Sequence, residues 1–267
     1  MKLMHFCPTC SAVNYVENAD GTASDSITEL LVIPLHDSAI YEVTCPEGHI
    51  SRIILQNQRY ELLFQSGVHA LLDGYYREAV SSIAVAVERF YEYSIRVLSA
   101  SFLDGVEKEN FDNTWKAISK QSERQVGAFY MLFLCVFQQP PILFDAKFLN
   151  RHGLRLGIEG NDPIKFRNLV IHQGYLPSYN QAIVFGEAVN FYVREVYNLY
   201  KENDKLDVLA PTFEDVRLAN SSLGQLAETS VLHTYSFISH MRMGPSMVKA
   251  SLIDYINWMR ENTQKTK

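Results

Sequence analysis

The segment FRNLVIHQG, from Phe166 to Gly174, combines an arginine, an amide and a histidine with a short run of aliphatic residues. Just before it, Asp162 and Pro163 form a strong helix start, because a carboxylate can cap the first turn and proline fits the first helical position. Gly174 is a strong stop, because glycine readily adopts the left-handed conformation that ends helices. The sequence therefore predicts a short helix of about ten residues.

Two interpretations of this helix are open. A histidine at a helix C-terminus is commonly an electrostatic cap, and Arg167 could be an ordinary surface residue. Alternatively, Arg167 and His172 form a catalytic pair, with polar Asn168 beside the arginine. Residues five apart lie about 140° apart around an ideal helix, whereas Asn168 and His172 share a face. A two-fold dimer could bring two Arg-His pairs into one cleft.

Apolar residues recur with helical spacing on both sides of this short helix, from Arg59 onward. The segment Gln121 to Gln138 is apolar at nearly every position and is expected to lie centrally. Ser178 and Gln181 form a capping box that begins a final long helix. The expected long helices are residues 59–73, 75–102, 121–138 and one that runs from Ser178 through Leu199.

The composition is that of an ordinary globular chain, with 267 residues, 47% hydrophobic and 20% charged. The longest apolar run, Val126 to Phe137, is too short to span about 30 Å of hydrocarbon. The N-terminal MKLMHFCPTC lacks the apolar run and cleavage site of a secretory signal. These features predict a cytoplasmic protein with no membrane partner.

The net charge of −6 and the pI near 5.8 argue against a general nucleic-acid coat, which requires a basic face. A local basic cleft is compatible with these values. The segment from Lys147 to Lys165 is rich in basic side chains, against only Glu159 and Asp162. The candidate binding residues for a polyanion are Lys147, Arg151, Arg155 and Lys165, with His152 among them.

Four residues near the N-terminus have metal-ligand spacing. Cys7 and Cys10 form one paired turn, and Cys45 and His49 form a second after a 34-residue gap. Two such turns around a hairpin-length insert are what a tetrahedral zinc ion requires. All four positions are filled by protein, which favours a structural Zn²⁺ and leaves no position for a catalytic water. Strand-like sequences at 27–34, 39–44 and 50–55 complete a zinc-ribbon-like module.

The motif CPTC is also typical of thioredoxin-like redox pairs. That chemistry needs a strand before the motif and a helix after it. Only six residues precede Cys7, and Ser11 to Asp25 is loop-like, so zinc is the favoured interpretation. The fourth cysteine, Cys135, lies in an apolar helix and is interpreted as a small buried residue.

The chain is expected to have three parts: a zinc-ribbon-like module over 1–57, a helical domain over 58–207 and a C-terminal extension over 208–267. The second boundary lies at the charged segment Lys201 to Asp207, with Pro211 beyond it. The extension is expected to be helical, most clearly over Val248 to Met259. His233 and His240 share a helix face there and are interpreted as surface or core residues.

The pattern Arg167-Asn168-x3-His172 between long helices resembles the HEPN superfamily (higher eukaryotes and prokaryotes nucleotide-binding domain), whose members carry Arg-polar-x(3-5)-His. The resemblance covers roughly residues 59–207. The segment Tyr75 to Val80, leading into Ala86 to Arg89, is similar to the family's early helix. Gly174 to Gly186 is similar to the segment after the family's histidine.

This resemblance implies a mainly α fold, in which a HEPN-like helical bundle carries a small N-terminal β-rich zinc ribbon and a helical C-terminal extension. It also implies a metal-independent endoribonuclease that acts on RNA as a homodimer with a composite active site. The catalytic residues would be Arg167, Asn168 and His172. Resemblance to HEPN toxins further implies growth arrest, antiphage defence or a toxin-antitoxin role, with an antitoxin or regulatory partner.

The expected chemistry is transesterification through the ribose 2′-hydroxyl. His172 could act as base or acid, because histidine titrates near neutral pH. Arg167 suits the growing negative charge of the phosphorane, since its guanidinium is permanently charged. Asn168 would hold the imidazole or a phosphate oxygen. Glu88 is a weaker candidate for the cleft, and an exposed charge paired with neighbours such as Arg89 is an equal alternative.

Two other classes of function are open. Some HEPN relatives are non-catalytic and bind nucleotide or RNA, or pair with a nucleotidyltransferase-type partner. The third interpretation is a zinc-ribbon adaptor whose helical body serves only for assembly.

Overall fold

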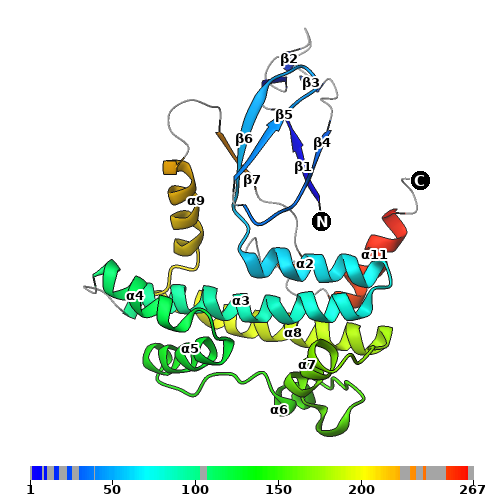
Figure 1. Cartoon of the computed structure of the whole chain (residues 1–267), viewed down its shortest axis with the longest axis vertical. Coiled ribbons are helices and arrows are strands. Elements are labelled where there is room, and N and C mark those ends of the chain that lie inside the picture. The colour runs from blue at the N-terminus through cyan, green and yellow to red at the C-terminus, as the bar shows by residue number, and fades with distance from the viewer. Residues whose placement is uncertain are drawn as a thin grey trace. The chain divides into compact units, whose positions relative to one another are not determined.

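The computed structural model divides the chain into two compact units (Figure 1). Unit 1 comprises residues 1–57 and 212–235, and unit 2 comprises residues 58–211 and 236–267. The segment 208–267, expected as one extension, is thus shared between the two units. The structure describes residues 2–7, 9–10, 15–17, 23–25, 30–38, 40–102, 107–222, 229–232, 237–238 and 251–263.

Unit 1 is built from short strands. They are β1 (Lys2–Phe6), β2 (Tyr15–Glu17), β3 (Ala23–Asp25), β4 (Leu30–Pro34), β5 (Ile40–Thr44), β6 (Ile50–Leu55) and β7 (Thr229–Leu232). β1 pairs with β4 and β2 with β3, both antiparallel. β6 lies between antiparallel β5 and parallel β7. The expectation of a small β-containing N-terminal part is confirmed, and β4, β5 and β6 fall in the three predicted strands.

Two expectations for this unit were wrong. The loop expected over Ser11 to Asp25 contains β2 and β3. The tail, expected to be helical throughout, is helical at Leu252–Thr263 but also contributes strand β7, whose Thr229 to Leu232 pair in register with Arg52 to Leu55. The tail also supplies helix α9 (Ala210–Ser222). Helical spacing cannot reveal β7, because a parallel strand pair is a long-range interaction set by the partner strand.

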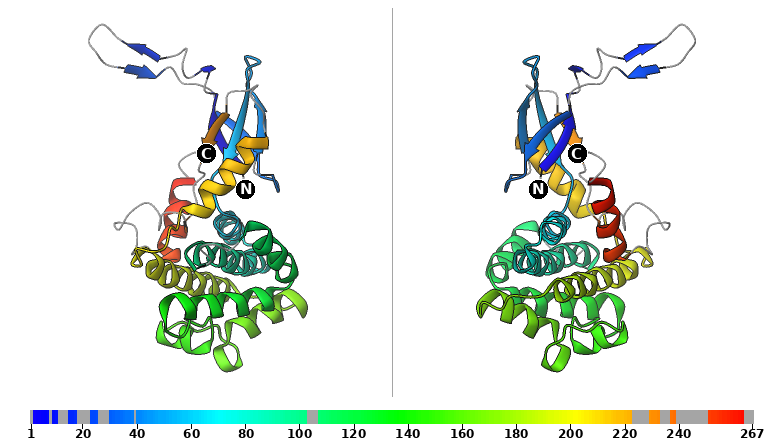
Figure 2. Two further views of the ribbon diagram at one scale, coloured as in Figure 1. Left: turned by 90° about the vertical axis from the view of Figure 1, so that its left-hand side faces the viewer. Right: turned by 90° about the vertical axis from the view of Figure 1, so that its right-hand side faces the viewer.

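Unit 2 is a helical bundle centred on α3 (Tyr76–Phe102), which contacts α2, α5, α7 and α8. The remaining helices are α2 (Arg59–Leu72), α4 (Lys108–Ile118), α5 (Ser122–Phe137), α6 (Ala146–Arg151), the 3-10 turn η1 (Glu159–Asn161), α7 (Pro163–His172), α8 (Tyr179–Lys201) and α11 (Leu252–Thr263). Helices α2, α3 and α8 run side by side (Figures 1 and 2). The predicted mainly helical class is confirmed.

Helix α5 does not occupy the centre of the bundle, although its apolar composition predicts a central position. Its side chains Met131 and Leu134 are 61% and 42% exposed, and only Gln125, Phe129 and Phe133 are buried. The central positions belong instead to α3 and α8, most of whose apolar residues are buried. An all-round apolar sequence is therefore not sufficient to place a helix in a core.

No helix in the described part of the chain is long and apolar enough to cross a membrane.

Helix α11 is fixed to the bundle by polar contacts with α8 and α2. The buried carboxylate of Glu187 accepts a hydrogen bond of 2.8 Å from the backbone N–H of Leu252, at the first turn of α11. Burial raises the pKa of Glu187. On the other side, Gln65 donates to the hydroxyl of Tyr255 over 3.1 Å. The C-terminal helix is thus an integral part of unit 2.

Helices α2 and α3 approach closely where α2 carries a glycine. A Cβ added at Gly67 would lie 2.5 Å from Ile83 Cγ1 and 3.0 Å from the carbonyl oxygen of Ala79. We expect Gly67→Ala to lower the free energy of unfolding by about 2 kcal/mol, because overpacking must push the two helices apart. Urea denaturation of the purified variant measures this effect.

A second helical glycine provides a matched control. An added Cβ at Gly127 in α5 meets nothing within 4 Å. Gly127→Ala should therefore leave stability unchanged or raise it by up to about 1 kcal/mol, since alanine is the better helix former. Equal stability of the two variants would contradict the close approach of α2 and α3.

Candidate functional site

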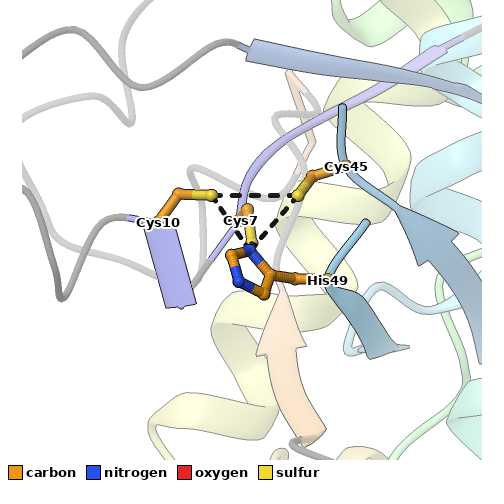
Figure 3. Close-up of side chains that lie close together, drawn as sticks. All are labelled: Cys7, Cys10, Cys45 and His49. Atoms are coloured by element: carbon orange, nitrogen blue, oxygen red, sulfur yellow. Dashed lines mark hydrogen bonds between the residues drawn. The ribbon is translucent and has the colours of Figure 1, made fainter. Parts of the chain in front are cut away.

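The predicted metal ligands come together in unit 1 (Figure 3). The ligand atoms of Cys7, Cys10, Cys45 and His49 all lie within 4.8 Å of one another. His49 Nδ1 is 3.3 Å from Cys10 Sγ, 3.5 Å from Cys45 Sγ and 4.0 Å from Cys7 Sγ. Cys10 Sγ is 3.8 Å from Cys45 Sγ. Residues far apart in sequence thus form one compact set of donors that could bind a metal ion.

The spacing of these atoms fits a tetrahedral site. With Zn–S bonds of about 2.3 Å and Zn–N bonds of about 2.0 Å, tetrahedral geometry puts two sulfurs about 3.8 Å apart and sulfur and nitrogen about 3.5 Å apart. The S–S distance of 3.8 Å matches the first value, and the S–N distances of 3.3, 3.5 and 4.0 Å bracket the second. Three sulfurs and one imidazole nitrogen form a donor set typical of structural zinc sites.

The thiols also influence one another. Desolvation, followed by hydrogen bonding to Cys7 and Cys45, raises the pKa of Cys10 to about 12. For Cys7, desolvation acts in the opposite direction to hydrogen bonds from the backbone of Cys10 and the neighbouring thiols, which prevail and lower the pKa. Crowded thiols therefore do not ionise together unless a cation compensates their charge.

A tight turn presents the second pair of ligands. The backbone N–H of Cys45 donates to the carbonyl of His49 over 3.0 Å, and the N–H of Gly48 donates to the carbonyl of Cys45 over 2.9 Å. Gly48 has a φ of 82°, which favours glycine.

The redox alternative for Cys7 and Cys10 requires a strand before the motif, and β1 does precede it, although the short segment before Cys7 argued against one. The two thiols of the motif nevertheless face Cys45 and His49 rather than forming an isolated redox pair.

The short helix predicted around FRNLVIH is α7, and its bounds are Pro163–His172. The side chain of Asp162 caps it by accepting hydrogen bonds from the backbone N–H groups of Ile164 and Lys165, at 2.7 and 3.2 Å. Gly174 has a φ of 71°, which ends the helix as expected. The capping box that begins α8 at Ser178 is confirmed as well.

Arg167 is held in place from two sides. Its guanidinium forms an ion pair with Glu88 of α3 and donates to Asn168 Oδ1 over 2.9 Å. The Arg167 and Glu88 side chains are only 24% and 22% exposed. These contacts leave further N–H groups of the guanidinium for other acceptors. The guanidinium is therefore pre-positioned, because a half-buried carboxylate on the neighbouring helix fixes its orientation.

His172 is the last residue of α7, and its side chain is exposed. Asn168, expected to hold the imidazole or a phosphate oxygen, accepts a hydrogen bond from Arg167 through its Oδ1. The helix thus presents a fixed guanidinium and, about 7.5 Å further along its axis, an accessible imidazole.

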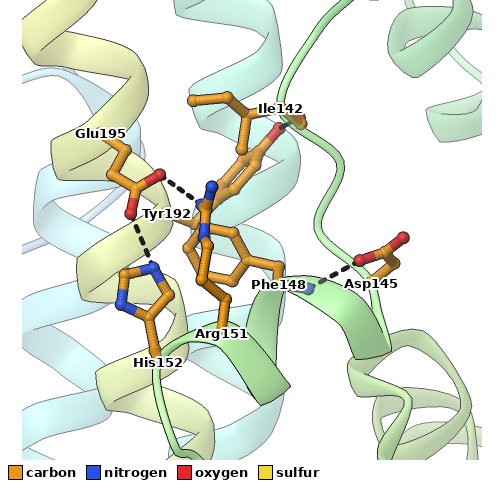
Figure 4. Close-up of polar contacts among 7 residues, drawn as sticks. All are labelled: Ile142, Asp145, Phe148, Arg151, His152, Tyr192 and Glu195. Carbon is orange, nitrogen blue, oxygen red and sulfur yellow. Dashed lines mark hydrogen bonds and ion pairs between the residues drawn. The ribbon is translucent and has the colours of Figure 1, made fainter.

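The predicted basic cleft is partly neutralised. Arg151 and His152 at the end of α6 both contact Glu195 of α8, each at 2.6 Å (Figure 4). Lys165 pairs with Glu159 at 3.3 Å. Arg155 donates to Asn150 over 2.7 Å, and Lys147 is exposed. Among the four predicted binding residues, Lys147 and Arg155 thus have no acidic partner in the described residues.

Two acidic residues, Glu88 and Glu195, pair with the candidate basic residues. The sequence gives a weak signal for the first and none for the second. From the sequence Glu88 is a weak candidate with Arg89 as an alternative partner, but Arg89 pairs with Glu92 instead, at 2.6 Å. Glu195 has no sequence signal of its own beyond its place on a helix. Both acids act across helices, and only the three-dimensional packing identifies such partners. His233 and His240 lie outside the described residues.

Comparison with known proteins found no matching family model, no similar curated protein and no similar solved structure.

Proposed function

We propose that this protein is an endoribonuclease of the HEPN type that cleaves RNA through the ribose 2′-hydroxyl. The observation that supports the proposal most is the arrangement of α7: a guanidinium fixed by Glu88 and Asn168 is followed on the same helix by the exposed imidazole of His172. A fixed cation and an accessible acid-base group are the two functions that this reaction requires.

In the proposed reaction, a neutral imidazole accepts the proton of the 2′-hydroxyl, and the resulting oxygen attacks the adjacent phosphorus. Arg167 donates hydrogen bonds to the non-bridging oxygens as their negative charge grows. A protonated imidazole then gives its proton to the departing 5′-oxygen. The products are a 2′,3′-cyclic phosphate and a 5′-hydroxyl. In this scheme the imidazole performs both proton transfers and Arg167 stabilises the negative charge.

A homodimer would complete the site. Arg167 and His172 lie about 140° apart around α7, so one copy of the helix does not direct both side chains at one phosphorus easily. A two-fold axis near the C-terminal end of α7 would supply a second imidazole and a second guanidinium to the same groove. The histidine of one subunit would then act with the arginine of the other, first as the base and then as the acid.

We further propose that the cluster in unit 1 binds a structural Zn²⁺. Cys7, Cys10, Cys45 and His49 would fill all four coordination positions, which leaves none for a reacting water. The ion would connect the turn after β1 to the β5–β6 hairpin, because it draws ligands from both. Its contribution is therefore to the fold of unit 1.

One observation favours a second candidate, a non-catalytic module for RNA binding or assembly. Arg167 and Arg151 are both paired with glutamates, which reduces the positive potential available to attract RNA. In this alternative, Glu88 and Arg167 would serve only to connect α3 with α7. Retained RNA binding by a wild-type protein that does not cleave RNA would support it.

A substrate modified at one position tests the proposed chemistry. We expect a single-stranded RNA to be cut in the presence of EDTA, and the same RNA with a 2′-methoxy group at the cleavage site to survive there, because the nucleophile is blocked. A DNA of the same sequence should also survive. Product analysis should reveal a cyclic phosphate. Cleavage at the methoxy position would contradict the proposal.

A further inference from the structure

A pocket of about 300 Å³ lies next to Arg167, between helices α3, α5 and α7. Its walls are mainly apolar and aromatic and include Tyr91, Tyr130 and Phe144, together with Ile164 of α7. Ile164 is 49% exposed, although it is a large aliphatic residue. Such a pocket favours a flat, largely apolar ligand group.

The polar groups of the pocket are few and distinct. Arg167 is the one cation among its lining residues, and Glu88 and Glu123 are its two carboxylates. Glu88 already binds Arg167. Among the described residues, Glu123 receives only a long contact of 3.4 Å from the hydroxyl of its neighbour Ser122. Glu123 is therefore the carboxylate with acceptor capacity for a ligand, and Arg167 is the group that would meet an anion.

We propose that this pocket binds the nucleobase next to the scissile phosphate and that it prefers guanine. Aromatic and aliphatic walls accept an unstacked base, which is how proteins read single-stranded RNA. The Watson–Crick edge of guanine presents a ring N–H and an amino group side by side, and these suit the two oxygens of Glu123. The phosphate attached to that nucleotide would then lie toward Arg167.

This inference rests on the proposed RNase function, because it takes its ligand from the RNA strand. The order of groups along α7 supports it. Ile164 lines the pocket, Arg167 lies at both the pocket and the proposed phosphate site, and His172 follows beyond. The base and phosphate sites would thus be neighbours along α7, next to the groove in which the proposed dimer brings the imidazoles together.

Binding of the four nucleoside 3′-monophosphates to the whole chain tests the proposal, because it needs no cleavage. We expect guanosine 3′-monophosphate to bind about tenfold tighter than the uridine, cytidine and adenosine compounds, as a charge-assisted contact allows. Glu123→Gln should remove this preference. Ile164→Trp should lower binding of guanosine 3′-monophosphate by at least about tenfold, because the indole fills the pocket from its rim.

Ile253→Trp is the matched control, because Ile253 is 45% exposed on α11 and does not line the pocket. This variant should bind like the wild type. Equal binding of all four nucleotides, or unchanged binding by Ile164→Trp, would overturn the proposal. Guanosine-selective binding without RNA cleavage would instead retain the pocket and refute the nuclease. Cleavage without base preference, unaffected by Ile164→Trp, would retain the nuclease and refute the pocket.

Discussion

Replacing His172 with alanine is expected to lower the rate of RNA cleavage by about 100-fold or more, since positioned acid-base groups contribute on this order. His172 is exposed at the end of α7, so its loss should change the free energy of unfolding by less than about 0.5 kcal/mol. Single-turnover cleavage and thermal unfolding measure the two effects separately. Gln173→Ala, at the exposed neighbouring position, is the control and should cleave normally.

Arg167→Lys provides the complementary variant. Lysine keeps the positive charge but cannot reproduce the planar guanidinium that contacts Glu88 and Asn168, so we expect a similar loss of cleavage. Mixing this variant with His172→Ala should restore activity, because a mixed dimer contains one arginine and one histidine that are intact. Random mixing would restore roughly a quarter of wild-type activity. Full cleavage by either single variant, or no recovery on mixing, would contradict a composite site.

The local features of the candidate site could be predicted from the sequence. The start and end of α7 are encoded by Asp162, Pro163 and Gly174, whose effects act within one helical turn. The cluster of Cys7, Cys10, Cys45 and His49 could also be predicted, because tetrahedral coordination restricts ligand type and spacing so strongly. In both cases a few residues with rigid chemical requirements determine the geometry.

The features that depend on packing between distant segments could not be predicted. The partner of Arg167 is 79 residues away on α3, and helical periodicity indicates only that Glu88 is on a polar side. The exposure of Met131 shows the same limit, because the position of α5 depends on which neighbours cover it. Strand β7 joins a sheet through residues more than 170 positions away. Sequence patterns describe one segment at a time, whereas these features arise from pairs of segments.

Loss of the proposed Zn²⁺ is expected to unfold unit 1 while unit 2 remains folded. The described strands of unit 1 are three to six residues long and form sheets of two or three strands, so their own packing supplies little stability. Structural zinc contributes about 10 kcal/mol or more to folding in small zinc-binding domains. Unit 2 has a large apolar core around α3 and no ligand in the cluster.

Cys45→Ser tests this expectation, because Cys45 is a buried candidate ligand in the turn between β5 and β6. We expect the wild type to hold a single zinc ion per chain and the variant to lose it. Backbone amides of β5 and β6 should then exchange rapidly with solvent, whereas those of α3 keep their protection. Cys135→Ser is the control, because this half-buried thiol of α5 lies outside the cluster and its loss should not change metal content. Removing one of four ligands must weaken coordination. A Cys45→Ser protein that keeps its full zinc content and its protected strands would therefore contradict the proposed zinc site.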